Sequence, residues 1–217
     1  MMSPLHYNGD DDNRLGMIMN EEQEKFLRRE FWMLSWRGSM PRPNKLYDSK
    51  ANDSDRSLFR EYLIDLCEKE LLPMYKDNQV FEWVHYENIE ELKHYANSRI
   101  FKYVLDKPYT IGLAQKLLNL QLKYLWCAGM SNKSPHCPID SIILSAAGWA
   151  KTKWPKIDSI ACYKDAINAI AETAKAEDYK DIVEWEINTF TAAVNRARIT
   201  RLMRSSISGW PATIIFG

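Results

Sequence analysis

The pattern of apolar and polar positions along the chain predicts a protein built from helices. Apolar side chains recur every three or four residues, the spacing of one helix face, over residues 21–37, 54–72, 88–96, 113–125, 160–170 and 178–204. Residues suited to helix N-caps stand before two of these segments: Asn20 before 21–37, and Asp158 or Ser159 before 160–170. A third candidate cap, Asp140, precedes the apolar residues that begin at Ile142. Residues 75–86 hold an aromatic and β-branched run that fits a strand, a bent helix or an extended connector, but a single strand has no partner. The expected fold class is therefore all-α.

The chain is expected to contain one helical domain behind a polar leader. Residues 1–19 include three consecutive aspartates and form the leader, and residues 20–217 form the domain. A division of the domain into two lobes flanking a cleft, residues 20–105 and 106–217, stays open. The sequence has no apolar run of membrane-spanning length and no secretory signal pattern at its start. We therefore expect a cytoplasmic protein with no membrane partner.

Candidate chemistry concentrates in residues 109–149. Pro108 and Gly112 indicate a turn that leads into a helix with a leucine-rich face. Four polar side chains fall outside that face and are expected to meet solvent, a partner or a cleft: Gln115, Lys116, Asn119 and Lys123. A proline-rich loop then delivers Asp140 to the start of another apolar segment, where free backbone N–H groups and the helix dipole favour a carboxylate.

These motifs resemble those of the helix-hairpin-helix DNA glycosylase superfamily, and especially its 8-oxoguanine DNA glycosylase branch. That family has a glycine-rich hairpin, a lysine early in the next helix, and a Pro-Val-Asp motif that opens a later helix. Gly112-Leu113-Ala114-Gln115-Lys116 is similar to the hairpin and lysine, and Pro138-Ile139-Asp140 is similar to the aspartate motif. Ala114 stands where the family has a second glycine. The resemblance implies a helical glycosylase fold with a helix-hairpin-helix-like element.

The resemblance also implies a catalytic pair. Lys116 would be the nucleophile that forms a Schiff base with the sugar, and Asp140 would be the catalytic carboxylate. The chemistry suits these residue types, because an amine that has lost its proton can attack C1′ of the sugar. A nearby carboxylate stabilises the positive charge that develops on that sugar. The alternative is structural, since surface lysines and aspartate caps are common.

The distribution of charge favours double-stranded DNA as the partner. The chain has 29 basic and 29 acidic residues and no net charge, but Asp140 is the only acid between Lys107 and Ile157, which holds seven lysines. An alternative is a basic face that acidic neighbours offset. The candidate DNA-binding residues include the hairpin and two arginines near the C-terminus: Gly112, Gln115, Lys123, Lys133, Lys151, Lys153, Lys156, Arg198 and Arg201.

A glycosylase that acts on duplex DNA must hold the extruded base between aromatic groups and contact its polar edge. Polar and aromatic residues near the two motifs are the candidates for such a base pocket: Asn119, Trp126, His136, Trp149 and Trp154. By analogy alone, a specialised substrate such as a modified cytosine of phage DNA would make the protein an antiviral defence enzyme. The excised base and the presence of lyase activity stay open.

The four cysteines are widely spaced and lack the close grouping of the iron–sulfur glycosylases. We therefore expect no cofactor and no metal, and a monomer. Two further functions stay open. One is a non-catalytic helical DNA-binding module, and the other is a helical protein-interaction subunit whose lysines are merely solvated.

Overall fold

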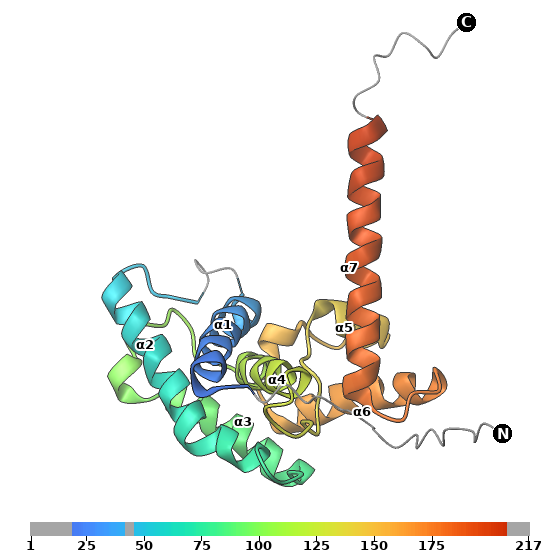
Figure 1. Ribbon diagram of the computed structural model, residues 1–217. Helices are drawn as coiled ribbons and strands as arrows, with labels where there is room; N and C mark the ends of the chain where they lie inside the picture. The colour runs from blue at the N-terminus through green and yellow to red at the C-terminus, as the bar shows by residue number, and fades with distance from the viewer. Residues whose placement is uncertain (1–18, 42–45, 208–217) are drawn as a thin grey trace, which may run out of the picture.

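The computed structural model describes residues 19–41 and 46–207, with side chains described as far as residue 200 (Figure 1). Its helices are α1 (Glu21–Ser39), α2 (Asp53–Leu66), α3 (Glu82–Ala96), α4 (Ile111–Cys127), α5 (Ser141–Ala146), α6 (Ile160–Ala176) and α7 (Ile182–Ile207). Short helical turns are η2 (Cys67–Leu71), η3 (Leu72–Tyr75), η4 (Arg99–Phe101) and η5 (Trp154–Lys156). Within these residues the only β pairing is an isolated bridge between Tyr47 and Leu105. The all-α prediction is confirmed, whereas most of the leader, residues 1–18, and the last ten residues lie outside the described part.

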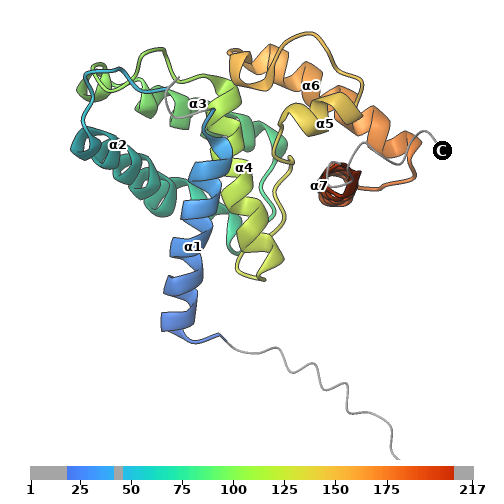
Figure 2. The ribbon, with the colours of Figure 1, turned by 90° about the horizontal axis from the view of Figure 1, so that it is seen from above.

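Helix α4 is the centre of the fold. Figure 2 shows it running beside α1, with α3 on its far side and α5 and α6 next to it. Every residue from Ile111 to Leu122 is buried, because other elements cover the helix all round. Of the three settings expected for the polar side chains, solvent is excluded for Gln115, Lys116 and Asn119, which are buried.

The buried side chains form one continuous core. It runs from Trp32 on α1 to Trp185 on α7, across the boundary that would separate two lobes at residue 105. Phe59 of α2 is one of the fully buried residues of this core. Phe101 and Tyr109 pack edge-on against its ring, at centroid distances of 5.2 and 6.1 Å. Elements from both halves of the sequence thus share the same apolar interior.

Local capping explains where most helices begin. The side chain of Asn20 accepts a hydrogen bond from Gln23 N, and Ser159 accepts one from Cys162 N, so both predicted caps are confirmed. The cap of α2 is Asn52, two residues before the apolar segment that starts at residue 54. Helix α3 begins at Glu82 rather than Asn88, so the last part of the aromatic run, residues 82–86, belongs to a helix.

Helix α7 differs along its length. Its first turns pack on the body, where Val183, Trp185 and Glu186 are buried. From Thr191 to Thr200 all described side chains except Ala193 are exposed. The second half of the helix stands away from the body in Figure 1.

Gly112 allows the start of α4 to approach η5 closely. Its N–H donates to Ile157 O at 2.7 Å, and a Cβ at this position would lie 1.8 Å from Trp154 O. Backbone, unlike a flexible side chain, cannot move aside without shifting η5 as a whole. Glycine is therefore required here for close packing.

We predict that Gly112→Ala lowers the free energy of unfolding by about 1–3 kcal/mol, because the added methyl group overlaps the η5 backbone. Gly38→Ala is the matched control, since a Cβ there meets only the end of the Leu120 side chain, at 2.9 Å. Alanine also favours helix over glycine, so this control should cost less. Urea unfolding followed by tryptophan fluorescence measures both, and equal losses would contradict the packing role of Gly112.

Candidate functional site

The fold brings Lys116 and Asp140 together. Lys116 Nζ lies 3.4 Å from Asp140 Oδ2, although the two residues come from different helices. Their side chains are only 10% and 14% exposed, so the ion pair is largely buried but keeps some contact with solvent. The pair implied by the family resemblance is thus a pair in space.

Helix α5 holds Asp140 in place. The Asp140 carboxylate is the N-cap of that helix, and its Oδ1 accepts from Ile142 N at 2.8 Å and from Ile143 N at 3.0 Å. This confirms the predicted cap and leaves Oδ2 as the oxygen that faces Lys116. Two backbone N–H groups therefore fix the carboxylate with one oxygen available for chemistry.

Lys116 occupies an unusual setting for an amine. Its Nζ lies 4.4 Å from the centre of the Trp154 ring, which belongs to η5. Burial lowers the pKa of Lys116, and the charge of Asp140 offsets part of that effect. A lower pKa gives more of the neutral amine, which is the nucleophilic form.

A second buried ion pair lies along the same helix. Lys123, two turns after Lys116, contacts both carboxylate oxygens of Glu186 at 2.9 Å, and its Nζ lies 5.3 Å from the Phe190 ring centre. Burial raises the pKa of Glu186, and Lys123 counteracts this. Sequence reasoning missed Glu186, although its position four residues from both Ile182 and Phe190 placed it within an apolar row of α7.

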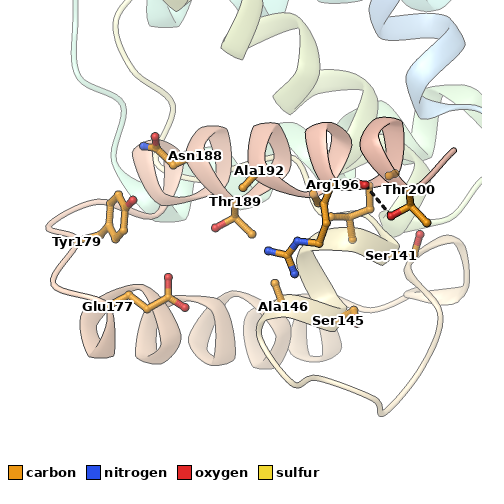
Figure 3. Close-up of a pocket in the computed structure, with 13 residues that line it drawn as sticks. Ser141, Ser145, Ala146, Glu177, Tyr179, Asn188, Thr189, Ala192, Arg196 and Thr200 are labelled. Atoms are coloured by element: carbon orange, nitrogen blue, oxygen red, sulfur yellow. Dashed lines mark hydrogen bonds between the residues drawn. The ribbon is translucent and has the colours of Figure 1, made fainter. Parts of the chain in front are cut away.

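An open groove of about 1220 Å³ begins beside Asp140. Ser141, Ser145 and Ala146 of α5 form one wall, and α7 forms the other from Asn188 to Thr200. Figure 3 shows the Arg196 side chain extending from α7 into the space between the walls, with Tyr179 and Glu177 at the far end.

Two predicted DNA-binding residues at the hairpin are corrected. The N–H of Gly112 is already bonded to Ile157 O, so it is not available to a phosphate. The Gln115 amide is fully buried and donates to Gly112 O and Ile139 O, while its oxygen accepts from Ile139 N. Both residues hold the protein together at this position.

The predicted base pocket is corrected at three positions. Asn119 is buried, with Nδ2 within 3.3 Å of Gln115 Oε1, Cys137 O and Tyr163 OH. His136 is buried between Tyr163 OH, 3.1 Å from Nδ1, and Glu82 Oε1, 3.0 Å from Nε2. Trp149 is also a core residue. Only Trp154 among the five lies against the Lys116 amine, and the half-buried Trp126 instead contacts Lys133, 5.3 Å from its ring centre.

Acidic neighbours offset several of the predicted phosphate-binding lysines. Lys133 pairs with Asp181 and Glu184, and Lys151 pairs with Asp165. Lys116 and Lys123 also form ion pairs, as described above. Four of the seven lysines of residues 107–157 are therefore paired with an acid. Lys153, Lys156 and Arg198 are exposed and have no ion pair within the described residues, and the side chain of Arg201 lies outside them.

Comparison of the chain with protein-family models, curated proteins and solved structures gives no match in any of the three. In the part of the chain that the structure describes, no cluster of three or more His, Cys, Asp or Glu side chains is placed to hold a metal ion. No helix among those residues combines the length and apolar character needed to cross a membrane. The chemistry of Lys116 and Asp140 therefore carries the functional argument.

The buried histidines predict how stability depends on pH. Burial lowers the pKa of His85 and of His136, so both stay neutral in the fold where they would titrate in the unfolded chain, near pH 6.5. Below that pH the unfolded chain binds more protons. The free energy of unfolding should therefore fall by about 1.4 kcal/mol per pH unit for each histidine that stays neutral. Urea unfolding at pH 7.5, 6.5 and 5.5 measures this.

His85→Gln should reduce the slope below pH 6.5, because it removes one of the two titrating rings. His94→Gln is the control, since His94 lies on the surface of α3. A free energy of unfolding that stays constant from pH 7.5 to 5.5 in the wild type would contradict the prediction.

Proposed function

We propose that the protein is a DNA glycosylase with abasic-site lyase activity that uses Lys116 as nucleophile and Asp140 as catalytic carboxylate. The observation that carries this proposal is the contact of 3.4 Å between Lys116 Nζ and Asp140 Oδ2 at a largely enclosed site. The order and spacing of the two motifs along the chain add support, through the glycosylase resemblance described above.

The proposed reaction breaks the bond between C1′ and the base nitrogen. The base leaves with the electron pair of that bond and takes up a proton, while positive charge develops on C1′ and the ring oxygen. The Asp140 carboxylate, held by two backbone N–H groups, stabilises that charge. The neutral Lys116 amine then forms a bond to C1′, loses a proton and opens the sugar ring to give an imine, from which strand cleavage follows.

The surroundings of the pair favour this chemistry over a purely structural role. A buried ion pair contributes little net stability, because desolvation of both charges offsets their attraction. The lowered pKa of Lys116 favours the neutral amine. A groove of about 1220 Å³ begins at Ser141, the residue after Asp140, and is large enough for part of a nucleic-acid strand. The substrate class we propose is a modified or damaged base in duplex DNA, with modified phage cytosines among the candidates.

Borohydride trapping tests the lyase chemistry. Wild-type protein is incubated with duplexes that contain uracil, 8-oxoguanine, alkylated bases or phage-type modified cytosines, and the imine is reduced to a covalent adduct. We expect an adduct with at least one substrate, and its loss in Lys116→Gln. Asp140→Asn should abolish excision with the fold intact, because asparagine also caps helices.

Lys164→Gln is the matched control for Lys116→Gln. Both ammonium groups lie 4.4 Å from an aromatic ring centre, Tyr86 in the case of Lys164, but Lys164 is exposed and, among the described residues, forms no ion pair with Asp140. This control should form the adduct like the wild type. Abasic sites scored in the same reactions identify a glycosylase without lyase activity. Neither adduct nor abasic site on any duplex would refute the proposal and favour a binding role.

A further inference from the structure

The second half of α7 is a helix with no covering element on the described part of the chain. Its ten residues from Thr191 to Thr200 are exposed except for Ala193, which is half-buried. At about 1.5 Å per residue the helix is about 39 Å long, so this half extends well beyond the first turns that pack on the core. A helix exposed on all sides gains little from tertiary packing, so a binding partner is a natural source of its stability.

The charge of this half identifies the chemistry of the partner. Between Ile187 and Gly217 the chain has four arginines and neither lysine nor any acid. This contrasts with residues 107–157, where acids pair with four of the seven lysines. Arg196 and Arg198 have no ion pair within the described residues. Guanidinium groups of this kind are complementary to phosphates, which arginine binds through paired N–H groups.

The groove connects this helix with the proposed catalytic pair. Arg196 extends into the groove, whose opposite wall begins at Ser141, the residue after Asp140 (Figure 3). The α7 wall of the groove includes three small side chains, those of Ala192, Ala193 and Ala197. Small side chains let a polymer backbone approach closely, and Arg196 supplies a positive charge at that point.

We propose that the second half of α7 and the groove beneath it bind the phosphate backbone of the DNA strand that carries the target nucleotide. This inference rests on the proposed glycosylase function and names where its substrate is held. Arg196, which lines the groove, contacts a phosphate of that strand, and the other three arginines of this half add positive charge along the helix. The wall from Asn188 to Thr200 is about 18 Å long, which spans about five base-pair steps of 3.4 Å.

The test is the salt dependence of DNA binding. Fluorescence anisotropy measures the Kd of the full chain for a duplex with a central tetrahydrofuran abasic analogue, from 50 to 200 mM salt. Replacing all four arginines by glutamine should weaken binding at least tenfold and reduce the slope of log K against log salt by about 3–4, since each phosphate contact contributes about 0.9. Arg196→Gln alone should reduce the slope by about 1.

The control removes the same charge elsewhere. Lys50, Lys69, Arg99 and Lys102 are exposed residues on other elements, and their combined replacement by glutamine should leave the slope unchanged. Equal weakening by the control variant would overturn the proposal.

The outcomes separate this inference from the proposed function. Excision by the wild type together with unaltered binding by the α7 variant would overturn the inference alone. Salt-dependent binding that the arginines control, without excision or imine formation, would refute the catalytic function but support the α7 contact. Absence of both binding and excision would overturn both. Sedimentation that shows self-association lost in the α7 variant, with DNA binding unaltered, would assign this surface to a second copy and overturn the inference.

Discussion

The pairing of the Gln115 amide with the backbone of Ile139 is the interaction on which the rest of the site depends. The side chain satisfies both the N–H and the C=O of Ile139 inside the core, where neither group could bond to water. The next residue on each side of this contact is a member of the proposed catalytic pair, Lys116 after Gln115 and Asp140 after Ile139. A buried amide that can bond in only one register therefore fixes the distance between the two charges.

The same principle extends along α4, whose polar side chains face the interior. Asn119 links Cys137 O with Tyr163, and Tyr163 bonds in turn to His136. The loop before α5 is thus bonded at several points to a helix that other elements already hold. Burial makes each of these bonds costly to break, because a polar group without a partner inside a protein loses its full solvation. The loop is consequently a rigid support for Asp140.

Sequence patterns predicted the helices and the two functional motifs but not the surroundings of the motifs. Capping is local, so Asn20, Asp140 and Ser159 were identified from their neighbours. The burial of Gln115 and Asn119 depends on elements distant in the chain, and a polar side chain on an amphipathic helix gives no sign of being enclosed. The seven lysines of residues 107–157 predicted a basic surface. The acids that pair with some of them come later in the sequence, namely Asp165, Asp181, Glu184 and Glu186.

Two ion pairs are enclosed where apolar side chains would fill the same space with no desolvation cost. Lys116 with Asp140 and Lys123 with Glu186 each remove two charges from water, and such pairs seldom add net stability. Helix α7 supplies the acid of the second pair from its packed half and carries arginines on its exposed half. One helix thus joins an enclosed region of offset charges to a surface of unpaired positive charge. The proposed function requires both environments side by side, because a glycosylase must attract a polyanion and still keep one amine neutral.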